Sequence, residues 1–207
     1  MDDVGRAAHW ERIFSTKAPE QLSWYQASPE RSLELIAKAG VGPDSEVIDV
    51  GGGDSTLVDA LLDRRWGHVT VLDISDAALR RARARLGARA RDVTWISGDV
   101  TRLVLPDDRF DLWHDRAVFH FLTEVEDRRR YVDAVRRSVK RGGYVIVATF
   151  APDGPARCSG LAVTRYDPEE LYAEFGAELE MIESARDVHR TPSGVAQPFT
   201  YVLLRRR

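Results

Sequence analysis

Hydrophobic residues along the chain follow two different spacings, and the alternation between them predicts the order of the elements. Short runs of mostly apolar residues are typical of strands buried in a sheet. Five such runs occur, at residues 46–50, 68–75 and 92–100, from Phe110 onward, and at residues 144–150. The last run is apolar throughout, as expected for a strand that is covered on both faces.

Segments with helical spacing separate these runs. In residues 29–40, Leu33, Ile36 and Ala37 share one face, and Gly40 is a stop signal. Helices are also predicted over residues 55–64, 76–87 and 126–143, the last of them closed by a glycine pair.

Strands that alternate with helices favour a doubly wound parallel sheet with right-handed crossovers. Toward the C-terminus the pattern changes, and residues 178–188 and 197–207 predict two strands with little helix between them. We therefore expect a Rossmann-like α/β fold with a seven-stranded sheet and a C-terminal antiparallel hairpin. One domain spans residues 1–207, with residues 1–40 as a helical cap or lid and residues 45–207 as the core.

Four aspartates stand at or just after the ends of successive predicted strands: Asp49, Asp73, Asp99 and Asp115. A single aspartate at such a position is usually a turn former or a helix cap. In open α/β sheets, however, ligands bind outside the carboxyl ends of the strands. A row of carboxylates at that edge is complementary to a ligand with positive charge or hydroxyl groups.

The turn after the first strand contains three consecutive glycines, residues 51–53, which let a ligand approach the backbone closely. A dinucleotide-binding turn has the pattern G-x-G-x-x-G. Here its third glycine would fall at Thr56, and Asp54 would place negative charge where a phosphate binds. Asp73 follows Gly53 by 20 positions, the spacing of an acid that binds a ribose diol. The turn therefore predicts a ligand with a ribose and without phosphates.

These motifs resemble those of class I S-adenosylmethionine-dependent methyltransferases. "VIDVGGGDS" resembles the first motif of that family, "VLDIS" the second, "GDV" the third, and "RGGYVIVATF" the strand before its C-terminal hairpin. The resemblance extends from about Trp10 to the C-terminus. It implies a methyltransferase that uses S-adenosylmethionine as its cofactor.

The resemblance also implies how the cofactor is held. Asp49 orients the ammonium group and the glycine turn, Asp73 accepts hydrogen bonds from the ribose hydroxyls, and Asp99 accepts one from the adenine amine. Further cofactor contacts are expected from Gly51, Gly53, Ile74, Val100, Trp24, Tyr25 and Arg116.

Three segments, "HWERIF", "LSWYQASPERSL" and "WHDRAVFHFL", resemble a narrower group of unassigned bacterial methyltransferases. They also distantly resemble protein-lysine methyltransferases, whose acid-basic-small motif corresponds to residues 115–117, with Arg116 in place of a lysine. We expect Asp115 and His120 to be the catalytic candidates, with His120 on the acceptor side. No ligand quartet with suitable spacing is present, so no metal site is expected.

Composition narrows the range of partners. The chain has 207 residues, of which 43% are hydrophobic, and a net charge of −3, which suits one domain and gives no reason to expect nucleic acid. No apolar run approaches the ~20 residues that span a bilayer. A single cysteine, Cys158, allows no internal disulfide. We expect a cytoplasmic protein without a membrane partner.

Several functions remain open at this point. We expect a small-molecule acceptor of the thiol, metalloid or amine type, and a protein lysine is the alternative. Two hypotheses of other classes are a nicotinamide-dependent oxidoreductase, which Asp54 and Thr56 disfavour, and a cofactor-binding module without catalysis.

Overall fold

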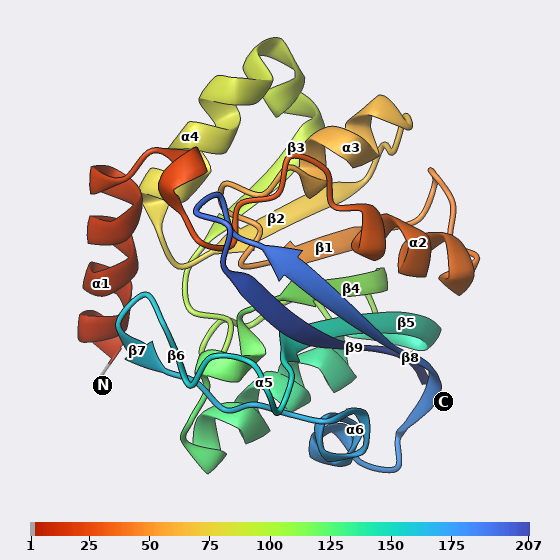
Figure 1. Ribbon diagram of the computed structural model, residues 1–207. Helices are drawn as coiled ribbons and strands as arrows, with labels where there is room; N and C mark the ends of the chain where they lie inside the picture. The colour runs from red at the N-terminus through yellow and green to blue at the C-terminus, as the bar shows by residue number, and fades with distance from the viewer. Residues whose placement is uncertain (1–2) are drawn as a thin grey trace.

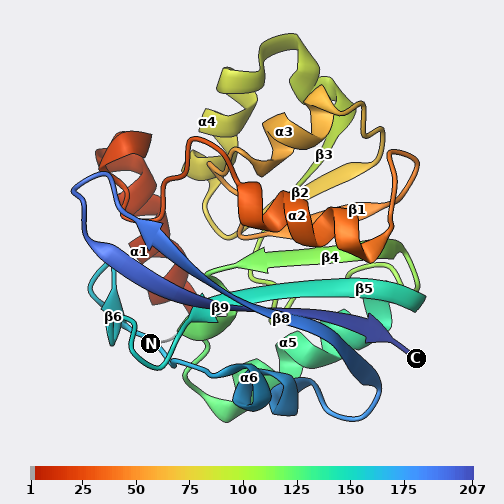
Figure 2. The ribbon, with the colours of Figure 1, turned by 45° about the vertical axis from the view of Figure 1, so that its right-hand side comes forward.

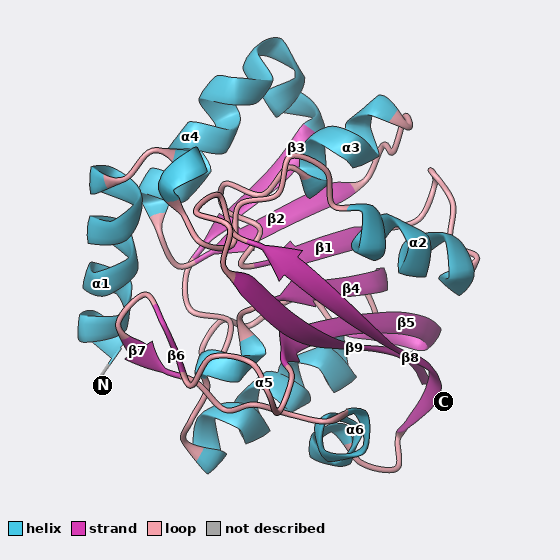
Figure 3. Cartoon of the chain, in the orientation of Figure 1, coloured by secondary structure: helices cyan, strands magenta, loops and turns pink. Residues whose placement is uncertain are grey.

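The computed structural model describes residues 3–207, with side chains from Gly5 onward, so the first two residues of the predicted cap lie outside the described residues. One sheet contains β1 (Val47–Val50), β2 (Val69–Asp73), β3 (Val93–Ser97), β4 (Phe110–Arg116), β5 (Val139–Phe150), β8 (Leu179–Arg190) and β9 (Ala196–Arg206). The strand order is β3-β2-β1-β4-β5-β9-β8 (Figures 1 and 3). Strands β1 to β5 pair in parallel, whereas β9 runs antiparallel to β5 and β8. The predicted seven-stranded sheet and its C-terminal hairpin are confirmed.

Helices cover both faces of this sheet (Figure 2). One face packs against α2 (Glu30–Ala39), α3 (Leu57–Asp63) and α4 (Asp76–Leu86), and the other against α5 (Val125–Ser138) and α6 (Pro168–Phe175). Short 3-10 helices are η1 (Pro19–Gln21), η2 (Gly87–Asp92) and η3 (Phe119–Phe121). Among residues 3–207, no helix has both the length and the apolar character needed to cross a bilayer.

Neighbouring residues of β1 show why its sequence is apolar without alternation. Val47 belongs to the core cluster that contains Leu35 of α2 and Leu61 of α3, whereas Ile48 belongs to the cluster that contains Tyr131 of α5. Successive side chains of a strand point to opposite faces. Because both faces are covered, every position of β1 is buried.

The helix predicted over residues 126–143 ends earlier than expected. α5 stops at Ser138, and the glycine pair lies at the beginning of β5. Gly142 has a φ of 79°, a backbone conformation that favours glycine, and a Cβ on Gly143 would lie 2.9 Å from a backbone carbonyl oxygen. The register between β4 and β5 shifts at this point. The glycines therefore form an irregularity in a strand instead of closing a helix.

Two features between β5 and β8 were not predicted from the sequence. One is a short hairpin of β6 (Arg157–Cys158) and β7 (Leu161–Ala162), and the other is α6. α6 begins with a capping box, in which Asp167 accepts a hydrogen bond from the Glu170 N–H at 2.8 Å and Glu170 accepts one from the Asp167 N–H at 3.0 Å. The signal was present in the sequence as an acid, a proline and two glutamates.

The N-terminal helix α1 (Asp3–Thr16) lies across the end of the sheet at which the parallel strands finish (Figures 1 and 2). Glu11 holds it to the start of α4. Its Oε2 accepts hydrogen bonds from the Ser75 hydroxyl at 2.7 Å and from the Ala77 N–H at 2.9 Å. Its Oε1 pairs with Arg80 at 2.9 Å. A carboxylate at a helix N-terminus is favourable, so these contacts fix α1 above the strand ends.

A buried polar network joins β4 to α5 behind those strand ends. The Tyr131 hydroxyl donates to Asp115 Oδ2 at 2.5 Å and accepts from Trp113 Nε1 at 2.9 Å. Asp115 also accepts from the backbone N–H groups of Val118 and Phe119 at 2.8 and 3.0 Å. Both carboxylate oxygens of Asp115 are thereby used to hold the turn that follows β4.

Replacing Tyr131 by Phe keeps the ring and removes the hydroxyl of this network. Two buried partners, one of them a carboxylate, lose a hydrogen bond, so at pH 8 we expect the free energy of unfolding to fall by about 2–4 kcal/mol. Urea denaturation measures this quantity. The control is Tyr172→Phe, which removes a half-buried hydrogen bond of 3.1 Å to the Leu179 carbonyl and should cost about 1 kcal/mol or less. Equal losses in the two variants would contradict a special role for the network.

Candidate active site

A cavity opens at the carboxyl ends of the parallel strands, beneath α1 and the loop that follows it. Its enclosed volume is about 100 Å³, and about 850 Å³ when the space open to solvent at its mouth is included. We call it the main cavity. A smaller hollow, which we call the turn cavity, lies at residues 51–57, and Trp24, Gly51 and Arg116 line both. The site lies at the carboxyl ends of β1 and β4, the neighbouring strands between which the strand order of the sheet reverses, as expected for a doubly wound sheet.

Most of the predicted site residues line one of these cavities. Those that line the main cavity are Trp24, Gly51, Asp73, Ile74, Asp99, Val100 and Arg116. Tyr25 and Asp49 line the turn cavity. Three predicted residues, Gly53, Asp115 and His120, are not among the residues that line either cavity.

Asp49, at the end of β1, is buried in a chain of hydrogen bonds. Its Oδ1 lies 2.7 Å from Nδ1 of His114 in β4, and Nε2 of His114 lies 2.8 Å from the Ser32 hydroxyl in α2. The other oxygen, Oδ2, is buried and has no hydrogen-bond partner among the described residues. A buried carboxylate oxygen without a partner is costly, so a ligand that donates a hydrogen bond there would be favoured.

The glycine turn packs directly on the acidic side chains. A Cβ on Gly52 would lie 2.5 Å from Asp49 Oδ2, and one on Gly53 would overlap Asp73 Oδ2. Gly51 has a φ of 68°, which strains other residues, and a Cβ there would also collide with a neighbouring side chain. Any side chain in this turn therefore displaces a carboxylate or the adjoining turn.

Asp73 is the buried acid at the end of β2. It accepts a hydrogen bond from the Ser75 N–H at 2.8 Å. Burial raises the pKa of Asp73 to about 7, and the nearby charge of Asp49 acts in the same direction, against the lowering effect of the hydrogen bond from Ser75. Asp73 therefore changes its protonation state near neutral pH in the absence of a ligand.

Asp99 is held by α1 as well as by its own turn. Its Oδ1 accepts hydrogen bonds from the N–H and the hydroxyl of Thr101 at 2.9 and 2.7 Å, and its Oδ2 lies 3.3 Å from Nη1 of Arg6. Arg6 also pairs with Asp127 at the start of α5. The helix that covers the cavity is thus attached to the acid that the sequence assigned to the adenine amine.

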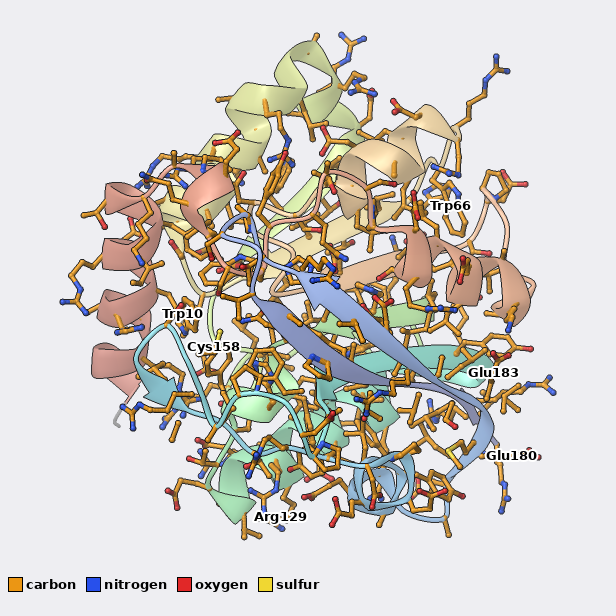
Figure 4. The ribbon with its side chains drawn as sticks, viewed as in Figure 1. Trp10, Trp66, Arg129, Cys158, Glu180 and Glu183 are labelled. Atoms are coloured by element: carbon orange, nitrogen blue, oxygen red, sulfur yellow. The ribbon has the colours of Figure 1, made fainter. Side chains whose placement is uncertain are left out.

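Aromatic side chains form much of the wall of the main cavity. Trp10, Phe14 and Trp24 come from the N-terminal segment, and Phe121, Phe150 and Phe199 come from the opposite side. The Trp10 ring stands 4.9 Å from Phe121 and 5.7 Å from Trp24, in edge-to-face arrangements. Trp10 and Cys158, labelled in Figure 4, both line the cavity.

His120 lies behind this wall. Its Nδ1 accepts a hydrogen bond from the Phe150 N–H at 3.3 Å, and its Nε2 is buried without a partner among the described residues. Burial lowers the pKa of His120 to about 3, and Arg116 acts in the same direction, so the ring is neutral. Phe121 and Phe150, at 4.5 and 4.8 Å from the imidazole, line the cavity in front of it. Contact between His120 and an acceptor stays a prediction.

Comparison with known proteins finds methyltransferases. Residues 47–143 match a family model described as a methyltransferase domain. The eEF1A lysine and N-terminal methyltransferase of Mus musculus is 28% identical over 141 residues, which cover 67% of this chain and 20% of that protein. The ubiquinone/menaquinone biosynthesis C-methyltransferase UbiE of Cupriavidus necator is 33% identical over 118 residues, which cover 56% and 47%. The chain thus spans between a fifth and half of the length of these curated relatives.

Solved structures of low sequence identity share the fold. One solved structure concerns the conversion of a disulfide bond into a thioacetal group during echinomycin biosynthesis. It superposes on this chain with a TM-score of 0.77 at 20% identity, and the superposition covers 97% of this chain and 92% of that one. The N-methyltransferase NodS from Bradyrhizobium japonicum, in complex with S-adenosyl-l-homocysteine, gives 0.73 at 17% identity over 95% and 97%. The cyclase SpnF gives 0.72 at 16% identity over 98% and 94%.

The raised pKa of Asp73 makes the stability of the protein depend on pH. The folded-state pKa of about 7 exceeds the ordinary value of 3.8, so the folded state holds the proton more tightly. The contribution of Asp73 to the free energy of unfolding is therefore complete below about pH 4. It is lost at about 1.4 kcal/mol per pH unit as the pH rises to about 7. Asp73→Asn does not ionise, and its free energy of unfolding relative to the wild type should rise between about pH 4 and pH 7 and stay level above that.

Urea denaturation of both proteins at several pH values measures this difference. Burial also raises the pKa of Asp115 to about 6, but Asp115 titrates in both proteins and cancels in the comparison. A difference that does not change with pH would contradict the raised pKa of Asp73.

Proposed function

We propose that the protein transfers a methyl group from S-adenosylmethionine to a small molecule, because residues 47–143 match a family model described as a methyltransferase domain. The acceptor is of the thiol, metalloid or amine type. The observation that carries this proposal is the packing of a glycine turn against two buried acids, Asp49 and Asp73, at the edge of an aromatic cavity.

The residues present fit the cofactor. Asp49 has a buried oxygen without a partner, which suits an ammonium group, and Asp73 can accept hydrogen bonds from two hydroxyls. Ile74 and Val100 line the same cavity and offer apolar contact to an adenine ring beside Asp99. The glycine turn leaves open the space that a Cβ would fill.

The bound cofactor supplies an electrophilic methyl group on a positively charged sulfur. The protein's part is to align an acceptor, which is worth up to ~7–11 kcal/mol, and to exclude water. The aromatic wall serves the second task, and rings such as Trp10 and Trp24 can stabilise a cation by ~0.5–2 kcal/mol. Among the described residues that line the main cavity there is no histidine.

A protein lysine is the alternative acceptor. The similarity to the eEF1A lysine and N-terminal methyltransferase and the motif at residues 115–117 support it. The cover of α1 and the following loop over the main cavity favours a small molecule, because a lysine on a protein surface would have to pass beneath that cover.

The hypotheses of other classes find less support. A pyrophosphate at the glycine turn would meet the Asp54 carboxylate, which lines the turn cavity, and this disfavours a nicotinamide cofactor. A cofactor-binding module without catalysis is the other hypothesis, since one fold can carry unrelated functions.

Charge and cysteine content support two further parts of the proposal: that no nucleic acid is a partner, and that the protein is cytoplasmic. Three of the four arginines on α4 are paired with acids: Arg80 with α1, and Arg81 and Arg85 with the segment around α3. A helix neutralised in this way is a poor surface for a nucleic-acid backbone. Cys158 is buried and unpaired, which supports a cytoplasmic location.

Calorimetry followed by a transfer assay tests the proposal. S-Adenosylmethionine and S-adenosylhomocysteine should bind, and NAD should not. Transfer of a labelled methyl group is then measured across thiols, metalloids, amines and a protein lysate. Binding of NAD without either sulfur compound would contradict the proposal, and binding without transfer to any acceptor would favour the non-catalytic module.

The glycine turn provides a matched pair of substitutions. Gly53→Ala places a Cβ on the Asp73 carboxylate and on the side chain of Ala78, so the affinity for S-adenosylhomocysteine should fall at least ~10-fold, the effect of losing a hydrogen bond to a charged group. Gly67→Ala meets nothing within 4 Å and should bind normally. Calorimetry measures both affinities, and circular dichroism checks the fold. Normal binding by a folded Gly53→Ala protein would exclude the turn from the cofactor site.

Replacing His120 distinguishes a role in binding the acceptor from a role in binding the donor. We expect His120→Ala to lower single-turnover rates far more than the affinity for S-adenosylhomocysteine, because His120 is assigned to the acceptor side. His68→Ala, at a largely exposed side chain, is the control. Equal losses of rate and affinity, or no loss of either, would leave His120 as a packing residue of the wall.

A further inference from the structure

Arg116, the last residue of β4, extends between the two cavities and lines both. Its Nε donates to the Tyr201 hydroxyl at 3.1 Å, and its Nη1 donates to the Trp24 carbonyl at 3.2 Å. The centre of the guanidinium stands 4.6 Å from the ring of Phe199. Three neighbours from distant parts of the chain therefore hold this side chain in one position.

The third nitrogen, Nη2, is buried and has no hydrogen-bond partner among the described residues. No carboxylate of the described residues forms an ion pair with Arg116, whereas Arg6, the other arginine of the main cavity, is paired with Asp99 and Asp127. A buried guanidinium nitrogen without a partner is costly. A structure that holds it so firmly is prepared for a ligand that supplies the missing acceptor atom.

The surroundings of Arg116 within the main cavity are uncharged. They include Phe199, Gln197 and Cys158. The Gln197 Oε1 is also buried without a partner, and rotation of the amide would present its NH₂ group as a second donor. The acids of this cavity, Asp73 and Asp99, follow β2 and β3, on the opposite side of β1 from β4 and β9. The cavity thus has an acidic side and a basic side.

We propose that Arg116 binds the methyl acceptor through a negative charge, so that the substrate class is a small molecule with an apolar body and a carboxylate or similar anionic group. This inference rests on the proposed function, since it places the donor on the acidic side. It also disfavours a protein lysine as the acceptor, because a lysine ammonium would approach a guanidinium that forms no ion pair with a carboxylate of the described residues.

The carboxylate of the donor is the other source of the same chemistry, and affinities for two donor fragments distinguish the two sources. S-Adenosylhomocysteine carries the amino-acid carboxylate, and methylthioadenosine lacks it. With Arg116 on the acceptor, Arg116→Met should bind both compounds within about twofold of the wild type. A loss of ~10-fold or more for S-adenosylhomocysteine alone would assign Arg116 to the donor and overturn the proposal.

The acceptor side is tested on the wild-type protein saturated with S-adenosylhomocysteine. The probes are phenylacetate, phenylacetamide and phenethylamine, which share an aromatic body and differ in charge. We expect phenylacetate to bind at least ~10-fold more tightly than the other two, the effect of hydrogen bonds between charged groups. Equal binding of the three probes, or a preference for the amine, would overturn the proposal.

Substitutions test whether Arg116 causes the preference for phenylacetate. Arg116→Met should abolish it and Arg116→Lys should retain part of it, with thermal denaturation as the check on folding. The control is Arg83→Met, which removes a guanidinium from above Trp95, outside the two cavities, and should leave the preference intact. A preference that persists in Arg116→Met would overturn the assignment. If the wild type does not bind S-adenosylhomocysteine at all, the proposed function itself fails, which is a different result.

Discussion

The direct contact between the turn at residues 51–53 and two buried carboxylates is the constraint on which the rest of the site depends. The turn approaches Asp49 and Asp73 so closely that only a hydrogen atom fits at each position facing them. Asp73 is buried beside this turn, and that burial raises its pKa to about 7. The protein therefore holds charge in an unfavourable environment at the place where a ligand with an ammonium group and hydroxyls would relieve it.

The cap over the cavity depends on the same row of acids. Arg6 of α1 pairs with Asp99, and Glu11 of α1 binds the start of α4 directly after Asp73. The cover and the acidic edge are thus mechanically connected, since movement of α1 breaks contacts made by residues at the cofactor side. The aromatic rings of α1 then complete a wall whose other half comes from β5, β9 and the turn after β4.

Charge is unevenly distributed around the cavity. Asp73 ends β2 and Asp99 follows β3, whereas Arg116, which ends β4, donates a hydrogen bond to Tyr201 of β9. In the function proposed above, such a division would orient a cationic donor and an anionic acceptor toward each other. Positioning and desolvation then supply the larger part of catalysis for a reaction whose electrophile is already activated.

The sequence by itself determined the sheet, its hairpin and the acidic edge. Strand ends are local features, and the carboxyl ends of parallel strands meet at one edge, so Asp49, Asp73 and Asp99 could be placed together from their positions in the chain. The family resemblance based on these motifs is confirmed by the match of residues 47–143. The glycine pair near residue 142 was misread because a helix cap and a strand irregularity use glycine for the same backbone freedom.

Only the tertiary structure decided which side chains face the ligand. Asp115 and Arg116 are adjacent in β4, and because successive side chains of a strand point to opposite faces, Asp115 is used in the core while Arg116 lines the cavities. Partners that complete the site are distant in the sequence: His114 and Ser32 are 82 positions apart, and Asp99 and Arg6 are 93 positions apart. Contacts over such separations leave no local pattern, since they arise from the packing of α1 and α2 on a sheet that must form first.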